Sequence, residues 1–195
     1  MAPAGRSGSR NTDKRQAILQ GTQRLMLTEG YGAVTFRAVA TAAGVAPGLV
    51  QYYFPSLDDL FIAVLRAATD RLITDLTHAT DSDQPLRAVW GYASDPTGTA
   101  LLAQFMALAN HLPQLGSVIG EGGERVRRAL LKSLTKKWPD YGLNDTGLTP
   151  AAALFLLSAI PRMVHLEKAL GTVTGHRDAV ALVERFLDRV EPRSG

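Results

Sequence analysis

The chain has 195 residues, of which 46% are apolar, and a formal net charge of +3. This length and composition suffice for one compact domain or for a small domain joined to a larger one. The absence of cysteine excludes a disulfide scaffold, a cysteine-ligated zinc site and a cysteine nucleophile. The longest apolar run, Ala151 to Ile160, is about half the ~20 residues that a membrane-spanning helix requires, so we expect no membrane segment.

Apolar residues recur at helical spacing nearly throughout, and no alternating β-branched run indicates a strand. We therefore predict an all-α fold of about nine helices. Residues 1–12 form a disordered basic arm in this interpretation, and the first helix covers residues 13–29. Two short helices follow, one beginning near Thr35 and ending at Gly44, the other covering residues 46–53. Ser56 then caps a long helix that reaches Leu76 or slightly beyond, with Asp59 in the capping-box position.

The remaining pattern predicts five further helices, near residues 85–92, 96–110, 114–137, 150–170 and 176–190. Four glycines between residues 116 and 123 are able to split the third of these. Pro161 lies inside the fourth and is expected to kink it, because proline removes one backbone hydrogen bond. We expect three parts: the arm at residues 1–12, a DNA-binding domain at residues 13–55, and a ligand-sensing and dimerisation domain at residues 56–195.

The segment from Thr35 to Phe54 has the composition of a helix-turn-helix. Such a motif needs a residue that accepts a positive φ at its turn, which Gly44 supplies. It also needs small residues where the helices cross and apolar anchors beyond the turn. Ala40 and Ala43 meet the first need, and Val39, Val45 and Val50 meet the second. The second helix then presents its outer face to a major groove.

Residues Lys14 to Phe61 resemble the DNA-binding region of the TetR family. The matching positions are Glu29-Gly30-Tyr31, Thr35 to Ala40, Gly44-Val45, Gly48-Leu49-Val50, Tyr53-Phe54, Ser56 and Leu60-Phe61. The resemblance implies a cytoplasmic transcription regulator, more often a repressor, which binds a palindromic DNA operator as a homodimer and responds to a small-molecule effector of unknown identity. It implies no cofactor, and it covers about a quarter of the chain.

The resemblance assigns DNA contacts that the chemistry of the side chains supports. Thr35 offers its hydroxyl and a backbone N–H to a phosphate, and Arg37 reaches a guanine edge or a phosphate. Gln51 suits an adenine, while Tyr53 either contacts a phosphate or joins the core. The full set of expected DNA-binding residues is Lys14, Arg15, Thr35, Arg37, Pro47, Gly48, Leu49, Gln51, Tyr52 and Tyr53.

Two positions depart from the family pattern. Gln51 stands where tyrosine is common, and Leu57 stands where a lysine usually faces a phosphate, so one backbone contact of the family is missing here. Residues 1–56 carry six Lys or Arg and two acidic side chains, a balance of +4. A positive charge of this size is enough for several phosphate contacts per subunit at most.

The last two predicted helices are candidates for the dimer interface. The helix at 150–170 is too apolar for solvent, and the helix at 176–190 has one apolar stripe. Two such helices from each subunit form a four-helix bundle about a two-fold axis, unless both pack only inside one subunit. The expected ligand-lining residues are Trp90, Phe105, Met106, Asn110, Phe155, Arg162, Met163 and Leu166. Arg162 either binds an anionic ligand or pairs with Glu167 or with an acid of the partner chain.

No enzyme motif is present. The sequence has no phosphate-binding loop, no nucleophile elbow and no histidine spacing typical of a metal site, so we expect neither catalytic nor metal-binding residues. The basic run between Arg125 and Lys137 indicates a solvated helix face rather than a second nucleic-acid surface. Two other classes remain as alternatives: a helical enzyme or carrier with an incidental helix-turn-helix, and an interaction module or activator that recruits polymerase.

Overall fold

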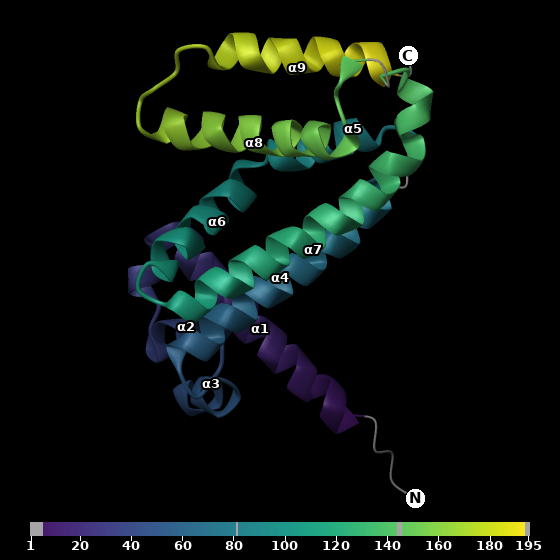
Figure 1. Cartoon of the computed structure of the whole chain (residues 1–195). Coiled ribbons are helices and arrows are strands. Elements are labelled where there is room, and N and C mark those ends of the chain that lie inside the picture. Colours follow the sequence, from purple (N-terminus) through teal and green to yellow (C-terminus); the bar gives the residue numbers. More distant parts are fainter. Residues whose placement is uncertain (1–5, 81, 144–145, 194–195) are drawn as a thin grey trace, which may run out of the picture. The chain divides into compact units, whose positions relative to one another are not determined.

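The computed structural model describes residues 6–80, 82–143 and 146–193 (Figure 1). The described part is helical and contains no strand, which confirms the predicted all-α class. Its α-helices are α1 (Arg6–Glu29), α2 (Phe36–Ala43), α3 (Pro47–Tyr53), α4 (Leu57–Thr80), α5 (Pro85–Ala93), α6 (Pro96–Ala109), α7 (Pro113–Lys137), α8 (Pro150–Ala169) and α9 (His176–Val190). Short 3-10 helices follow α1 at Tyr31–Ala33 and α7 at Trp138–Tyr141.

Helices α1 and α4 extend beyond their predicted bounds. Helix α1 begins at Arg6, so the described part of the predicted arm is helical; residues 1–5 lie outside the described residues. Packing of Ile18, Leu19 and Met26 nucleates α1, and each upstream residue then adds a hydrogen bond at low cost. Helix α4 runs to Thr80, whose hydroxyl donates to the Leu76 carbonyl at 2.8 Å.

Helix α7 is continuous despite its four glycines. Leu115, Leu130 and Leu134 are buried along one side of the helix, so tertiary packing outweighs the weak helix propensity of glycine. One of the glycines is required by the packing itself. A Cβ on Gly122 would lie 3.1 Å from Oγ1 of Thr69 on α4.

The chain forms two compact units, each with its own apolar core. Unit 1 comprises the residues up to Thr69 together with Ala100–Gly122, and unit 2 comprises Asp70–Thr99 and the residues from Gly123 onward. Unit 1 therefore extends past the expected domain boundary after residue 55. Leu60 and Val64 of α4 and Phe105 of α6 are buried in the same cluster as the residues of α1–α3. The three short N-terminal helices are too small to enclose a core without this cover.

Helix α2 begins and ends at the predicted residues. The Thr35 hydroxyl accepts a hydrogen bond from the Ala38 N–H at 3.1 Å and caps the N-terminus. Gly44 ends the helix with φ 67° and ψ 36°, a left-handed conformation that only glycine adopts without strain. The chain then enters α3, whose Val50 is buried. The turn angle of the predicted helix-turn-helix is thus fixed by one glycine.

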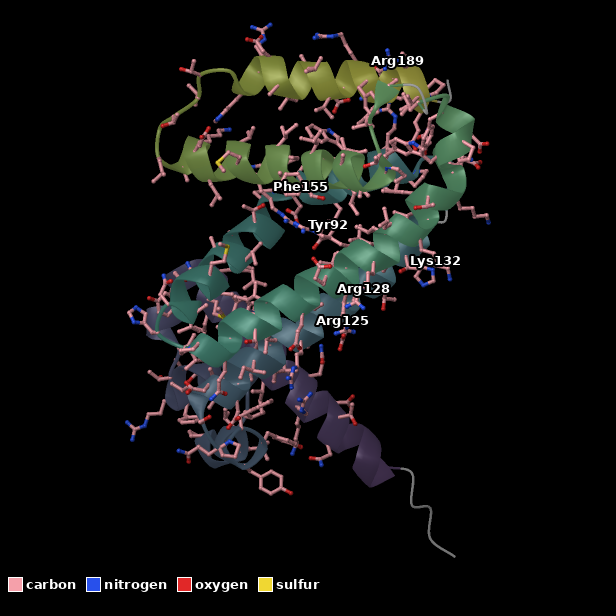
Figure 2. All side chains as sticks on the ribbon, viewed as in Figure 1. Tyr92, Arg125, Arg128, Lys132, Phe155 and Arg189 are labelled. Carbon is pink, nitrogen blue, oxygen red and sulfur yellow. The ribbon has the colours of Figure 1, made fainter. Side chains whose placement is uncertain are left out.

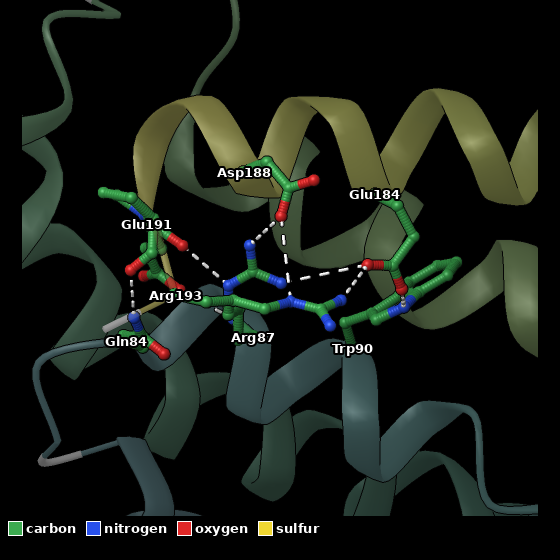
Figure 3. A network of polar contacts seen from close by, with 8 residues as sticks. Gln84, Arg87, Trp90, Glu184, Asp188, Glu191 and Arg193 are labelled. Carbon is green, nitrogen blue, oxygen red and sulfur yellow. Dashed lines mark hydrogen bonds and ion pairs between the residues drawn. The ribbon is translucent and has the colours of Figure 1, made fainter. Parts of the chain in front are cut away.

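In unit 2 a carboxylate from the end of α9 caps the start of α5 (Figure 3). Glu191 is buried and accepts hydrogen bonds from the backbone N–H groups of Leu86 at 3.0 Å and Arg87 at 2.8 Å. These donors have no partner within their own helix, and a carboxylate there is favoured by the helix dipole. The hydroxyl of Tyr141 also donates to Glu191. Burial raises the pKa of Tyr141, and its hydrogen bond to Glu191 raises it further.

The same contact is continued by side chains that join α5 to α9. The Arg87 guanidinium donates to the Asp188 carboxylate at 2.5 Å and to the Glu191 carbonyl at 2.6 Å. The indole N–H of Trp90 donates to Glu184 at 2.7 Å. Because Glu184, Asp188 and Glu191 recur at helical spacing, one side of α9 is held against α5.

We predict that Gly44→Ala lowers the free energy of unfolding by about 1–2 kcal/mol, because alanine is strained in the left-handed region. No atom lies within 4 Å of the position of the added Cβ, so a loss reports backbone strain rather than a clash. Gly120→Ala, in the exposed interior of α7, is the control and is expected to gain up to about 1 kcal/mol. Urea denaturation of both variants measures the difference. Equal stabilities would contradict the assigned turn.

Candidate nucleic-acid interface

One side of α3 is exposed and the other anchors the helix. Pro47, Gly48, Gln51 and Tyr52 are exposed, and their spacing of three and four residues places them on one helix face. The opposite side carries Val50, which is fully buried, and Phe54 follows it into the same core. The exposed face therefore combines a proline and a glycine at the helix start with an amide and a phenol one turn later. These groups are suited to close approach and hydrogen bonding in a groove.

Two residues expected at this surface differ in their surroundings from the others. Leu49 is half-buried, because it lies between the exposed face and the buried face of α3. The hydroxyl of Tyr53 donates to the Asn11 carbonyl on α1 at 3.1 Å, so its proton is already used within unit 1. Tyr52 is 75% exposed, and its ring meets that of Tyr53 edge-on at 5.4 Å. Tyr52 thus has the freer hydroxyl of the two.

Three cationic side chains and one hydroxyl complete the predicted set in unit 1. Lys14 and Arg15 are exposed on α1, and Arg37 is exposed on α2. The Arg15 guanidinium lies 5.3 Å from the ring centre of Phe54, which directs this cation toward the end of α3. Thr35 is exposed, and its oxygen accepts from Ala38, so the hydroxyl hydrogen remains available to an acceptor.

The departure at Leu57 has a structural explanation. Leu57 is half-buried and packs against the core of unit 1, so the first turn of α4 presents an apolar side chain where the family usually has a cation. Ser56 caps that turn by accepting from the Asp59 N–H at 3.0 Å and donating to the Asp59 carboxylate at 2.6 Å. The start of α4 is therefore intact, but it supplies no positive charge.

Sequence reasoning missed two residues that position the interface. The Arg24 guanidinium on α1 donates to the Ala42 carbonyl near the end of α2 at 2.6 Å. A Cβ on Gly21 would lie 3.1 Å from the backbone nitrogen of Ala43, so α1 and α2 cross at the closest approach that glycine permits. The signal for Gly21 was its place in the interior of an otherwise regular helix, where glycine needs a packing reason. No feature of the sequence around Arg24 predicted its hydrogen bond to α2.

The residues expected to line a ligand site are distributed over both units. In unit 1, Phe105 is buried in the core, whereas Met106 and Asn110 are exposed. In unit 2, Trp90 is buried and hydrogen-bonded to Glu184. Both buried rings pack in the apolar core of their own unit.

The remaining ligand candidates lie on α8, on two different faces. Phe155, Arg162 and Leu166 are seven and four residues apart and therefore share one face, on which Phe155 is 54% exposed. The Arg127 guanidinium of α7 lies 5.6 Å from the ring centre of Phe155. Figure 2 shows Phe155 on the side of α8 that faces away from α9. Met163 belongs to a second face with Leu156, and both side chains are about half exposed.

The neighbourhood of Arg162 bears on one of the alternatives left open by the sequence, which is pairing with Glu167. Glu167 does not pair with Arg162, because its carboxylate lies 2.6 Å from Nε2 of His176 at the start of α9. Burial lowers the pKa of Arg162, while Tyr92 raises it and Arg127 lowers it. The side chain is half-buried, and among the described residues no carboxylate lies within ion-pair distance of it.

No helix in the described part of the chain has the length and apolar composition to cross a membrane. Among these residues, no group of three or more histidine or acidic side chains is placed to hold a metal ion.

Comparison with known proteins identifies the N-terminal region. The sequence model for bacterial regulatory proteins of the tetR family matches residues 18–64. The HTH-type transcriptional regulator BetI of Rhizobium meliloti is 35% identical over 66 residues, which are 34% of this chain and 32% of BetI. The match thus spans about a third of the length of the first curated relatives.

Solved structures extend the likeness to most of the chain. A TetR transcription regulator from Haloarcula marismortui has a TM-score of 0.70 at 20% identity, covering 92% of this chain and 98% of that one. A protein from Saccharomonospora viridis, solved in complex with choline, has a TM-score of 0.69 at 16% identity, covering 89% and 96%. At these identities the likeness shows the fold. Members of the family are regulators and not enzymes. Residues 18–64 therefore match the helix-turn-helix region of the TetR family of transcription regulators, and the described chain shares the fold of solved TetR-type structures.

Proposed function

We propose that the protein is a ligand-responsive repressor that binds a palindromic DNA operator as a homodimer in the cytoplasm. The exposed face of α3 in each subunit contacts one half-site, and a small molecule bound to the C-terminal helices releases the operator. The observation that carries this proposal is the exposed set Pro47, Gly48, Gln51 and Tyr52 on a helix whose opposite side is anchored by Val50. A surface of polar and small residues on a rigid helix is suited to a major groove.

Charge around α3 supports a polyanionic partner. The cations Lys14, Arg15 and Arg37 are exposed on α1 and α2, while Asp59 at the start of α4 is hydrogen-bonded to Ser56. Each cation neutralises at most one phosphate, so one subunit makes few phosphate contacts. Two recognition helices in one particle are therefore needed for stable binding, and they read half-sites about one helical turn apart, ~34–36 Å.

Exposed apolar side chains on α8 and on α9 support dimerisation by the last two helices. The two helices lie side by side and run in opposite directions, joined by the short segment around Gly171 (Figure 1). On α8 the exposed apolar side chains include Leu156 and Met163, seven residues apart, and on α9 Leu182 is 62% exposed. Large apolar groups exposed together mark an interaction site, and a two-fold axis buries each of them twice.

The structure of the Saccharomonospora protein with choline supports a small-molecule effector for this chain, because it shows a protein of the same fold with an organic ligand. A ligand that binds more tightly to one conformation shifts the population away from the conformation that fits the operator. Moving from mostly bound to mostly free DNA requires about 5 kcal/mol of differential affinity.

The operator proposal is tested by fluorescence anisotropy of the purified full chain with DNA taken from upstream of its own gene. We expect specific binding whose affinity falls steeply as salt increases from about 50 to 200 mM, because bound phosphates release counterions. Scrambled DNA of equal length is the control. Equal binding to both DNAs at moderate salt would contradict sequence-specific recognition, and a reporter assay with the gene deleted distinguishes repression from activation.

We predict different effects for two variants of the interface. Arg37→Ala should weaken binding to all DNA sequences and reduce the salt dependence by about one phosphate contact per subunit. Gln51→Ala should cost about 1–3 kcal/mol on the operator and relax the preference at one base position. Competition against operators substituted at each position measures both effects. Lys136→Ala, an exposed cation on α7, is the control and should bind like wild type. If Arg37→Ala and Gln51→Ala also bind like wild type, the assigned interface is wrong.

We predict that Met163→Glu and Leu182→Glu each convert the dimer to a monomer at micromolar concentration. Each substitution places two unpaired carboxylates at a two-fold interface, which should raise the dimer dissociation constant about a hundredfold or more. Sedimentation equilibrium measures this change. Tyr52→Glu alters a more exposed side chain on α3 and should leave the dimer intact. Dimers of unchanged affinity in both α8 and α9 variants would place the subunit interface elsewhere.

A further inference from the structure

Arg162 is the charged residue of unit 2 whose role the fold does not explain. It is half-buried on α8, between the exposed Phe155 seven residues earlier and the exposed Leu166 four residues later. Among the described residues, no hydrogen bond or ion pair is formed by its guanidinium. None of its nitrogens is both fully buried and unpartnered, so the guanidinium keeps contact with solvent, and no partner within the fold accounts for its place on an apolar helix.

The acidic groups of unit 2 that lie near α8 are already used elsewhere. Glu167 pairs with His176, and Glu184 accepts from Trp90 and Arg193 on the α5 side of α9. Asp95 accepts from the Thr97 N–H at 3.1 Å at the start of α6. Among the described residues, no carboxylate thus lies within ion-pair distance of the Arg162 guanidinium.

The groups that do surround Arg162 favour an anion. Burial raises the pKa of Tyr92 of α5 most strongly, whereas Arg162 lies close enough to lower it, and Asp95 and Asp75 raise it. Arg127 lies close enough to lower the pKa of Arg162 and at the same time contacts the ring of Phe155. Figure 2 shows Tyr92 and Phe155 on the same side of α8. Two guanidinium groups, a phenol donor and an aromatic ring therefore converge within one unit.

We propose that Arg162 binds the acidic group of the effector, and that the effector is an organic carboxylate with an apolar body. The guanidinium offers two parallel donors to a carboxylate, the Tyr92 hydroxyl adds a neutral donor, and Arg127 adds a second positive charge. Phe155 and Leu166 contact the apolar body of the ligand. This inference rests on the proposed function, because it assigns the chemical class of the small molecule that the regulator senses.

A quaternary ammonium effector such as choline fits these residues poorly. Aromatic rings bind such cations when no like charge is near. Here Arg127 already occupies the face of Phe155, and Arg162 lies on the same helix face, so an incoming cation meets two positive charges. We therefore expect this chain to bind an anionic ligand, unlike the choline-bound protein of the same fold.

Binding is tested on the full-length dimer without DNA by isothermal titration calorimetry. The probes are decanoate and benzoate, their neutral amides decanamide and benzamide, and choline. We expect at least one carboxylate to bind, its amide to bind tenfold to a hundredfold more weakly, and choline not to bind. Arg162→Gln should weaken carboxylate binding by the same factor, whereas Arg189→Gln, an exposed cation on α9, should not change it. Binding of the amide as tightly as the acid, binding of choline, or no binding of either acid would overturn the proposal.

Thermal unfolding without ligand separates a binding role from a structural one. Arg162→Met keeps the volume of the side chain and removes an unpaired charge, so its midpoint should equal or exceed that of wild type. A lower midpoint would show that Arg162 pairs with an acid in the dimer, and it would overturn the proposal.

Adding the bound carboxylate to the operator complex then tests the regulatory role separately. If the acid binds through Arg162 but leaves operator affinity unchanged, the release mechanism fails while the site stands. If operator binding is specific and neither acid binds, the site assignment fails while the regulator stands.

Discussion

The burial of one side of α3 is the constraint on which the DNA-facing surface depends. Val50 and Phe54 pack into a core formed by α1, α2, α4 and α6, and this packing holds the opposite side of α3 outward. The left-handed backbone at Gly44 sets the direction in which the chain enters the helix. The close crossing of α1 and α2 at Gly21, together with the hydrogen bond from Arg24 to Ala42, then fixes the two helices that carry α3. Apolar packing and backbone geometry therefore determine where the exposed side chains of α3 lie.

In unit 2, polar contacts hold α5 and α9 together and leave other faces of the helices exposed. Glu191 caps the start of α5 from the end of α9, and Arg87 and Trp90 extend that contact along α9 (Figure 3). Because polar contacts secure one side of α9, its Leu182 side and the Leu156 side of α8 need not contribute to the fold of a single subunit. Arg162 differs from most half-buried charged residues of unit 2, because those residues form ion pairs or hydrogen bonds.

Local signals in the sequence identified the N-terminal motif because its determinants are local. A capping hydroxyl at Thr35, a glycine at a left-handed position and helical apolar spacing each act within a few residues, so they predict α2 and α3 closely. Long-range packing was less predictable. The continuity of α7 depends on buried leucines that outweigh its glycines, and the inclusion of Phe105 in the core of unit 1 depends on a helix far away in the chain.

The candidate ligand residues show the same distinction. Apolar content alone selected Trp90, Phe105, Phe155 and Met163, yet the structure gives them three kinds of surroundings: core, a face shared with two arginines, and a face shared with other exposed apolar groups. Helical spacing within α8 separates Phe155 from Met163, but only the neighbours contributed by α5, α7 and α9 say what each face contacts. An arginine in an apolar helix was the stronger signal, because a charge requires a partner and an apolar side chain does not.

The modest positive charge of the helix-turn-helix region limits how tightly a single subunit binds DNA. With few exposed cations on α1 and α2 and an apolar Leu57 at the start of α4, a single subunit gains little from phosphate contacts. In the proposed dimer, specific affinity would arise from two recognition helices held in one particle, where the second contact occurs at high effective concentration. A change in the spacing of the two helices would remove that advantage without altering α3. The proposed effector would then need only to favour one spacing over another, and the small number of phosphate contacts per subunit would make operator binding sensitive to that preference.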